Sequence, residues 1–235
     1  RQLVLERLAQ ARGQIPENIG SPEMGPISTG LGEIYQYELK STDGTHDATA
    51  LRTIQDWNVR RQLLGVPGVT EVNSFGGFEK QYQVRLDPEK LQSYGLTLRD
   101  VYEAVSRNNS NVGGAYIEKG SEQYLLRGIG LVEKAEDVAN IVVKTGKEGV
   151  PVYVRDVAEV VEGATVRQGA VTADGEGEIV AGIVMMLKGE NSRTVVEAVK
   201  ERVEQIKKSL PNGVELVPFY DRTELIDRAI YTVEK

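Results

Sequence analysis

The fold is decided by residues 33–75, which read EIYQYELKSTDGTHDATALRTIQDWNVRRQLLGVPGVTEVNSF. The first part, Glu33 to Leu39, predicts a short strand, and a polar turn follows at Ser41 to Gly44. A helical pattern then runs up to Pro67-Gly68, where it ends because proline cannot continue a helix. The last part, Val69 to Phe75, predicts a second strand. The stretch therefore predicts a β-α-β unit.

The helix of this unit carries an N-cap signal and one apolar face. Asp47 precedes the helical pattern, and an aspartate in that place can accept a hydrogen bond from a backbone N–H of the first turn. The apolar residues that we expect to face inward are Leu51, Ile54, Trp57 and Leu64. These side chains predict the contact between the helix and its sheet.

A second group of elements is predicted near the end of the chain. In chain order these are two strands, a helix, a turn and a strand, at Gln168 to Ala173, Glu178 to Leu187, Thr194 to Leu210, Pro211-Asn212-Gly213 and Val214 to Tyr220. Together with the first unit they predict an α+β fold, a split β-α-β ferredoxin-like sandwich.

The strand that ends at Leu187 contains two adjacent methionines, Met185 and Met186. Thioethers bind soft ions such as Cu(I), but consecutive strand residues point to opposite faces and cannot converge on one ion. Residues 179–187 are apolar on both faces, which is typical of a strand covered on both sides. We therefore expect both methionines to lie in the core.

The stretch between the two groups, about Gly77 to Arg167, has its own elements and predicts an inserted α+β subdomain. Gly76-Gly77 marks its entry, and Thr97 with Asp100 forms a capping-box pattern. The other expected elements are a strand, a helix and a closing strand at Gln81 to Leu86, Ala135 to Val143 and Val152 to Val161. A hairpin is predicted from Ala115 to Ile117 and Gln123 to Leu126 around Lys119-Gly120, and we interpret it as an oligomer contact.

The chain opens with an amphipathic helical pattern that carries Leu3, Leu5, Leu8 and Ala9. A turn with Pro16 and Asn18 follows, so that a helix, a Pro-Asn turn and a strand are expected here as they are near the C-terminus. This echo suggests a duplicated α/β unit whose first copy is represented by its last helix and strand. Both ends of the chain are expected to be cuts in a longer protein, and the orphaned strand predicts self-association or disorder near residues 1–30.

Composition excludes several classes of protein. The 235 residues carry a net charge of −7, which would repel phosphate backbones, so nucleic acid is not an expected partner. No apolar stretch approaches the ~20 residues that cross a bilayer. The absence of cysteine excludes disulfides and thiolate metal sites. A folded domain of ordinary globular composition remains.

Catalytic and metal-binding motifs are absent from the sequence. His46 is the single histidine, so sites that need several nitrogen or sulfur ligands cannot be assembled, and we expect His46 to be a solvated loop residue. No nucleophile motif or phosphate loop appears. A carboxylate pair acting as acid and base stays open in principle, but no spacing singles one out. The sequence does not predict an enzyme.

Two charged motifs have plain structural interpretations. The run Asp174-Gly175-Glu176-Gly177-Glu178 resembles a hard-cation loop, but it lacks the later bidentate glutamate of calcium loops, so a hairpin turn is preferred. Asp221-Arg222 and Asp227-Arg228 fall in a helical pattern and predict ion pairs on a helix surface.

Five blocks of the sequence, in order, resemble periplasmic segments of heavy-metal efflux pumps of the resistance-nodulation-division (RND) kind, of the cobalt-zinc-cadmium and copper-silver type. The blocks are Thr29-Gly30-Leu31-Gly32-Glu33-Ile34-Tyr35-Gln36-Tyr37, Leu51-Arg52-Thr53-Ile54-Gln55-Asp56-Trp57, Val66-Pro67-Gly68-Val69, Gly149-Val150-Pro151-Val152-Tyr153-Val154-Arg155-Asp156-Val157-Ala158 and Pro218-Phe219-Tyr220-Asp221-Arg222-Thr223-Glu224-Leu225-Ile226. They cover nearly the whole chain, and their combination is more specific than any single motif.

The resemblance implies a division of the chain. Residues 1–28 would be the C-terminal remnant of a first porter subdomain, and residues 29–76 with 168–220 the second porter subdomain. Residues 77–167 would be an inserted docking subdomain, and residues 221–235 a helix leading toward a membrane span.

The resemblance also implies a function and partners. The chain would be a periplasmic fragment of a proton-driven heavy-metal cation transporter in a bacterial inner membrane, forming part of the substrate cleft and of the trimer and docking surface. Identical subunits in a trimer, a periplasmic adaptor protein and an outer-membrane channel would be its partners. No cofactor is implied, and the alternative is a free-standing ferredoxin-like ligand-binding or regulatory module.

One residue of the chain is implicated in metal binding by the resemblance. Glu33 resembles an acidic residue that faces the cleft in zinc-type pumps, and the alternative interpretation is an ordinary glutamate at a strand end. A carboxylate there would suit Zn²⁺, Co²⁺ or Cd²⁺, whereas Cu or Ag, the substrates of the other branch, would prefer sulfur. Glu33 is therefore the candidate metal ligand.

Overall fold

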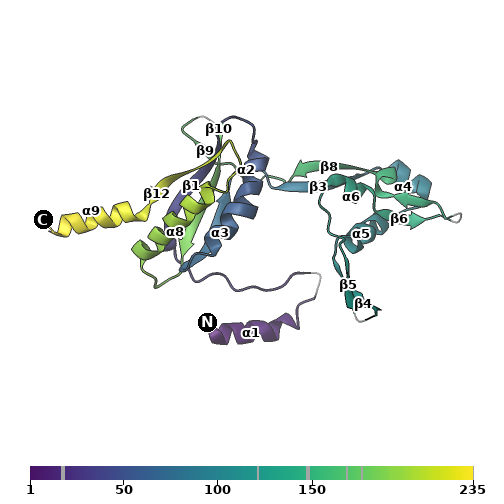
Figure 1. The fold of residues 1–235 in the computed structure, drawn as a ribbon, viewed down its shortest axis with the longest axis horizontal. Coiled ribbons are helices and arrows are strands. Elements are labelled where there is room, and N and C mark those ends of the chain that lie inside the picture. The colour runs from purple at the N-terminus through teal and green to yellow at the C-terminus, as the bar shows by residue number, and fades with distance from the viewer. Residues whose placement is uncertain (17–18, 121, 147–148, 168, 176, 235) are drawn as a thin grey trace. The chain divides into compact units, whose positions relative to one another are not determined.

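The computed structural model describes residues 1–16, 19–120, 122–146, 149–167, 169–175 and 177–234. The chain divides into two compact units (Figure 1). Unit 1 comprises Arg1–Phe78 and Arg167–Lys235, and unit 2 comprises Glu79–Val166. No helix in the described ranges is both long enough and apolar enough to cross a membrane.

Unit 1 is built on a four-stranded sheet. Its strands are β1 (Glu33–Ser41), β2 (Val69–Phe75), β11 (Val180–Met186) and β12 (Val214–Asp221), in the order β12-β1-β11-β2. Every neighbouring pair is antiparallel. Because β1 and β11 lie in the middle although they are far apart in the sequence, the sheet has the ferredoxin-like arrangement, and the predicted α+β fold class is confirmed.

The core of unit 1 forms between this sheet and its helices. The helical elements are α2 (Ala48–Ile54), the π-helical turn η2 (Gln55–Val59), α3 (Arg60–Leu64) and α8 (Ser192–Lys207). Asp47 caps α2 as predicted, since its Oδ1 accepts a hydrogen bond from Ala50 N at 2.8 Å. Apolar side chains from the helices meet those of the strands in one buried cluster, which includes Tyr37, Leu63 and Val199.

The prediction that Trp57 and Leu64 face inward is wrong. Trp57 is 64% exposed and Leu64 is 41% exposed, whereas Gln55, Val59 and Leu63 are buried. The reason is the turn η2, because a π-helical turn adds a residue to the helix and rotates everything after it. The apolar face therefore continues one residue away from the place that a regular 3.6-residue period predicts.

The methionine prediction is confirmed, but one predicted strand is not formed. Met185 is 8% exposed, and Met186 packs against the core cluster. Of the strand predicted at residues 168–173, only β9 (Thr172–Ala173) forms, and it pairs with β10 (Gly177–Glu178) in a small hairpin outside the four-stranded sheet. The hairpin interpretation of residues 174–178 is thus confirmed, while Gln168 and Glu176 lie outside the described residues.

The first element, α1 (Gln2–Arg12), has no buried residue. No strand follows it among the described residues up to Ser28, so the predicted copy of the helix-turn-strand unit is wrong. A strand forms only where a neighbour accepts its hydrogen bonds. Among the described residues, a backbone hydrogen bond from Lys188 N to Ile27 O at 2.9 Å joins this segment to the chain just after β11.

Unit 2 has a second, smaller core. Its strands form three antiparallel pairs: β3 (Lys80–Leu86) with β8 (Ala158–Ala164), β4 (Val112–Lys119) with β5 (Glu122–Gly128), and β6 (Val142–Thr145) with β7 (Pro151–Tyr153). Its helices are α4 (Pro88–Tyr94), α5 (Leu98–Arg107), α6 (Ala135–Ala139) and α7 (Val154–Val157). The capping box of Thr97 and Asp100 at the start of α5 is confirmed.

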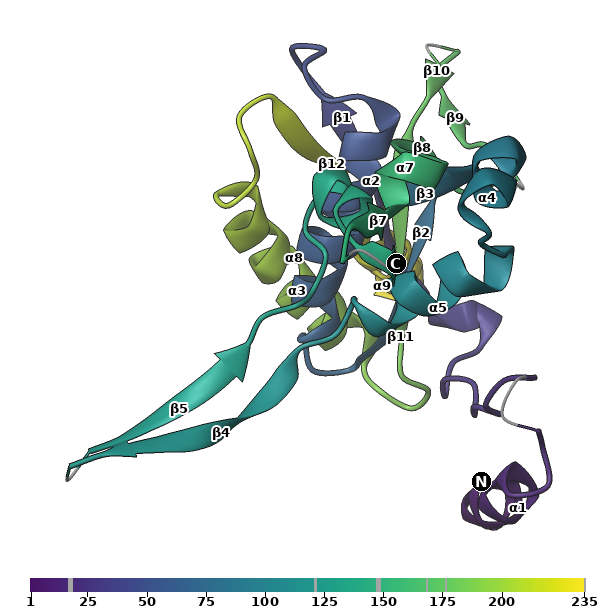
Figure 2. The ribbon, with the colours of Figure 1, turned by 90° about the vertical axis from the view of Figure 1, so that its right-hand side faces the viewer.

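Two predicted elements of unit 2 are broken by local structure. The helix predicted over residues 135–143 ends at Ala139, because the following residues pair as β6 with β7. The strand predicted over residues 152–161 is interrupted by α7, where Asp156 Oδ2 accepts a hydrogen bond from Tyr153 N at 2.8 Å and so begins a helical turn. The predicted hairpin is confirmed, and it is longer than predicted (Figure 2).

Candidate functional site

The sheet of unit 1 has a face turned away from its helices, called here the second face. Side chains alternate along a strand. Tyr37 and Leu39 lie in the core cluster, so Gln36, Glu38 and Lys40 belong to the second face. Polar groups thus gather on this face of β1, in contrast to the apolar face that meets the helices.

Glu33 begins β1 and is positioned by the residues on both sides of it. Gly32, which precedes it, is buried, and a Cβ atom there would lie only 3.1 Å from the carbonyl oxygen of Met186. A β-bulge follows, so that Ile34 and Tyr35 both enter the core. Gln36 Nε2 then donates a hydrogen bond to Glu33 Oε2 at 3.2 Å. The half-buried carboxylate of Glu33 therefore belongs to the second face.

Strand register places two further metal-donor side chains in one row with Glu33, Met185 next to it and Glu71 one strand further. Glu33 is paired with Met185 on β11, and Met185 is paired with Glu71 on β2. Paired residues point to the same face, and their Cβ atoms lie about 5 Å apart. We call these three residues the carboxylate row. The next row along the same strands pairs Gln36 with Ile183 and Ile183 with Asn73, which adds two amide groups.

The carboxylates of the carboxylate row form no ion pair in the described chain. Among the residues that the structure describes, neither Glu33 nor Glu71 takes part in an ion pair. The guanidinium of Arg222 lies close, but it donates to the backbone carbonyl oxygens of Leu31 and Glu33. Two carboxylates without an ion-pair partner therefore flank a buried thioether.

The adjacent charges on β12 and α9 (Arg222–Glu234) are internally compensated. Asp221 pairs with Lys200, and its Oδ1 accepts hydrogen bonds from Thr223 N at 2.8 Å and Thr223 Oγ1 at 2.6 Å. Burial raises the pKa of Asp221, but the hydrogen bonds from Lys200 and Thr223 outweigh it, so the pKa lies below its ordinary value. The predicted ion pairing on a helix surface is confirmed for Asp227, which pairs with Arg193, and for Arg228, which lies 4.0 Å from Glu224. It is wrong for Asp221-Arg222, because Asp221 ends strand β12 and Arg222 donates to backbone carbonyl oxygens.

The carboxylate row alone is not a metal site. Within the described parts of the chain, no group of three or more His, Cys, Asp and Glu residues could hold a metal ion. Two carboxylates and a thioether supply oxygen and sulfur donors, and a full coordination sphere needs further ligands. The row can therefore contribute ligands to a cation but cannot enclose one.

The other singled-out residues have structural roles. His46 lies in a loop as predicted, but it is half-buried and not simply solvated, because its Nε2 is 3.1 Å from Asn212 O and joins two loops. A carbonyl oxygen only accepts, so the proton of this contact is on Nε2. Glu178 Oε1 accepts from Gly77 N and pairs with Arg167, which is not the arrangement of a calcium loop.

Glu33 is predicted from the sequence as a metal ligand and stays a prediction, whereas Glu71 and Met185 are not among the predicted ligands. Glu71 is an isolated glutamate in a strand pattern, and Met185 is predicted only as a core residue. The signal that unites them is the order and register of the sheet, which brings residues 33, 71 and 185 together. No spacing along the sequence carries this information.

Comparisons with known proteins agree on one family. The family model described as "AcrB/AcrD/AcrF family" matches residues 1–235. The chain is 50% identical over 242 residues to the cobalt-zinc-cadmium resistance protein CzcA of Cupriavidus metallidurans. It is 45% identical over 230 residues to the cation efflux system protein CusA of Escherichia coli K12. The alignments cover 100% and 98% of this chain.

A solved structure, described as an X-ray crystal structure of a heavy metal efflux pump in crystal form II, is similar to this one. Its TM-score is 0.79 at 35% identity, and the match covers 91% of this chain and 21% of that one. The chain spans 22% of the length of the CzcA and CusA relatives. Its similarity to heavy-metal efflux pumps confirms the resemblance of the five sequence blocks. The chain belongs to the AcrB/AcrD/AcrF family.

Proposed function

We propose that the chain is a periplasmic part of a proton-driven heavy-metal cation efflux transporter of a bacterial inner membrane, and that the second face of unit 1 borders the path of the cation. The observation that carries this is the carboxylate row, two carboxylates that form no ion pair in the described chain and that flank a buried thioether. The names of the relatives support the class of substrate. The chain has no catalytic role in this proposal, and the free-standing ligand-binding module is not favoured.

The proposal includes a division of labour along the chain. Residues 1–28 end the first porter subdomain, residues 29–76 and 168–220 form the second, and residues 221–235 lead toward a membrane span. Residues 77–167 form the docking subdomain. The separate core of unit 2 and its place between β2 and β11 support an insert of this kind.

The donor set favours a divalent substrate cation. Carboxylate oxygens of Glu33 and Glu71 suit Zn²⁺, Co²⁺ and Cd²⁺, whereas Cu and Ag ions prefer sulfur-rich sites. Met185 adds one soft donor, which favours Cd²⁺ over Co²⁺. The ligands that complete the coordination sphere come from parts of the transporter beyond residues 1–235, which fits a site that must release its ion.

The hairpin of β4 and β5 is our proposed contact between identical subunits in a trimer. Its described β5 residues are all exposed, and an isolated two-stranded hairpin is marginally stable in water. Its exposed large apolar side chains among the described residues are Val112, Tyr116, Ile117, Tyr124, Leu125 and Leu126. A second copy of the chain would cover them. In the full pump, a periplasmic adaptor protein and an outer-membrane channel complete the path out of the cell.

A chimera tests the proposed function. The segment of CzcA that aligns with residues 1–235 is replaced by this chain, and Zn²⁺, Co²⁺ and Cd²⁺ resistance is measured in cells without their own pump. We expect the chimera to confer resistance and the same chimera with Glu33→Gln to lose most of it. Glu89→Gln, a neutralised glutamate on the exposed surface of α4, is the matched control. Full resistance with Glu33→Gln would refute the role of the carboxylate row.

A further inference from the structure

The chain leaves unit 1 through a closely packed exit. After β2 ends at Phe75, Gly76 and Gly77 follow with φ angles of 72° and 64°, a conformation that favours glycine. A Cβ atom on Gly76 would overlap the carbonyl oxygen of Ile179, and one on Gly77 would lie 2.6 Å from the carbonyl oxygen of Ala48. The exit is therefore wedged between the start of α2 and the residue before β11, unlike a free linker.

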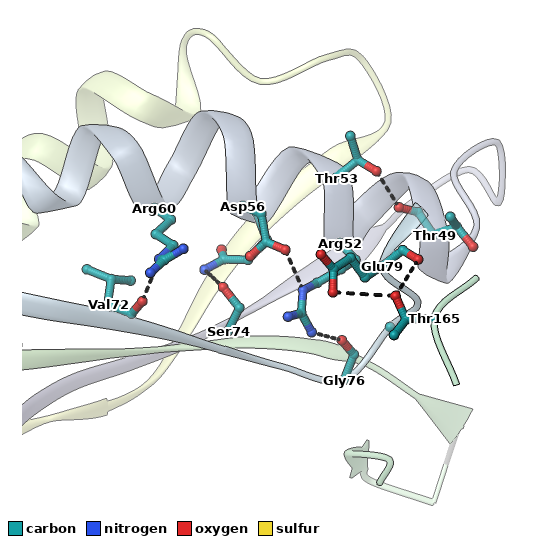
Figure 3. Close-up of polar contacts among 12 residues, drawn as sticks. Thr49, Arg52, Thr53, Asp56, Arg60, Val72, Ser74, Gly76, Glu79 and Thr165 are labelled. Carbon is teal, nitrogen blue, oxygen red and sulfur yellow. Dashed lines mark hydrogen bonds and ion pairs between the residues drawn. The ribbon is translucent and has the colours of Figure 1, made fainter. Parts of the chain in front are cut away.

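An arginine of α2 holds the exit from one side. Arg52 Nε is 2.7 Å from Asp56 Oδ2, and Arg52 Nη1 donates a hydrogen bond to Gly76 O at 2.7 Å (Figure 3). Both side chains are only 21% exposed, so water screens this pair less than a surface pair. Asp56 lies within the π-helical turn η2, so the irregular part of the helix is linked directly to the exit.

A glutamate holds the exit and the return together. Glu178 Oε1 accepts a hydrogen bond from Gly77 N at 3.2 Å and pairs with Arg167 Nη2 at 2.6 Å. Arg167, where the chain re-enters unit 1, places its guanidinium carbon 4.6 Å from the ring centroid of Phe78. One carboxylate thus bridges the two segments that connect unit 1 with the insert.

We propose that Arg52, Asp56, Glu178 and Arg167 form a root clamp, a conformational device that couples helix α2 to both connecting segments. Arg52 links α2 to Gly76, and Glu178 links Gly77, where the chain leaves unit 1, to Arg167, where it returns. A displacement of α2 breaks the bond to Gly76 O and loosens Gly77, which lowers the order of the Glu178 bridge. The clamp therefore opens as one unit, and motion of α2 reaches the insert through both segments at once.

Hydrogen-exchange mass spectrometry of the 235-residue chain tests the clamp. Arg52→Lys removes the hydrogen bond to Gly76 O, and Glu178→Gln weakens the contacts of residue 178 with Gly77 N and Arg167. Each substitution is expected to speed exchange in the peptide spanning residues 74–80 about tenfold. Because the interactions of Arg52 and Glu178 open together, the double variant should exchange little faster than the faster single variant. Glu103→Gln, which removes the exposed partner of Arg99 and Arg107 on α5 of unit 2, is the control and should leave this peptide unchanged.

The outcomes separate coupling from local damage. Multiplying effects in the double variant, or no effect of either substitution, would overturn the proposal. Unchanged exchange in α8 shows that unit 1 is still folded. If a variant does not fold, the wild-type chain provides the test, since raising the salt concentration should speed exchange in residues 74–80 and in α2 together. If a higher salt concentration sped exchange in only one of these two segments, that result would equally overturn the proposed clamp.

Discussion

The phenol ring of Tyr37 lies across Gly182, its partner on the neighbouring strand β11, so closely that a Cβ atom on Gly182 would overlap the ring. Tyr37 is fully buried, and its ring therefore occupies the space that a side chain at residue 182 would need. Packing between the central strands β1 and β11 thus depends on a large side chain at residue 37 and on the absence of one at residue 182.

Gly182→Ala is expected to destabilise unit 1. The added methyl group forces the Tyr37 ring out of its place, and overpacking of a core costs about 1–3 kcal/mol of unfolding free energy. Urea denaturation followed by circular dichroism measures the change. Gly25→Ala serves as the control, because no atom lies within 4 Å of a Cβ there. Equal stability of the two variants would contradict the packing described.

Gln55→Leu is expected to leave the buried hydroxyl group of Tyr37 without a hydrogen-bond partner. Gln55 is 0% exposed, its Oε1 accepts from Tyr37 Oη at 2.9 Å, and its Nε2 donates to Ser74 Oγ at 3.2 Å. Leaving a buried polar group without a partner costs about 1–3 kcal/mol. In a double-mutant cycle with Tyr37→Phe, the double variant should lose less stability than the sum of the two. Additive losses would show that the two groups do not interact.

Stability should fall at high pH through Tyr35. Burial, with the negative charges of Asp221 and Glu204, raises the pKa of Tyr35 from 10 to about 12. The folded state thus holds the proton more tightly than the unfolded state, and this contribution is complete below pH 10 and disappears as pH rises toward 12. Tyr35→Phe should flatten the decline between pH 10 and 12 in urea-denaturation midpoints. Burial also raises the pKa of Tyr37, so some decline persists in that variant.

The carboxylate row should bind divalent cations weakly in the 235-residue chain. Isothermal titration with Cd²⁺ is expected to show one weak site, and Glu33→Gln or Glu71→Gln should reduce its affinity on the order of tenfold or more. Met185→Leu should weaken Cd²⁺ binding more than Co²⁺ binding, because only the softer ion gains from sulfur. Identical losses for both ions would exclude Met185 as a ligand.

The sequence predicts those elements that depend on local residue patterns. Its predictions fail where the structure depends on irregular helical turns or on contacts between side chain and backbone. Strand β2 and the caps at Asp47 and Thr97 follow from spacing and side-chain chemistry alone. The inward residues after Gln55 do not, because one additional residue in a π-helical turn rotates the rest of the helix. The break at Asp156 depends on a single side-chain hydrogen bond inside an apolar run.

The candidate site was accessible to sequence reasoning only in part. Glu33 follows from a resemblance between sequence blocks, and it stays a proposed ligand. Glu71 and Met185 join it because strands far apart in the chain pair in one register. A register is a property of the assembled sheet, in which a shift by one residue would move each side chain to the other face.

The pairing of β3 with β8 at the ends of unit 2 affects how the chain folds. Strands β2 and β11 are neighbours, but the whole of unit 2 separates them in the sequence. An insert that folds first brings its own ends together, since Lys80 pairs with Ala164. Shortening the effective loop between Phe75 and Ala181 from about 105 to about 20 residues removes roughly 1.4 kcal/mol of closure entropy from the assembly of unit 1. We therefore expect unit 2 to fold early and to act as the nucleus around which the two halves of the sheet are joined.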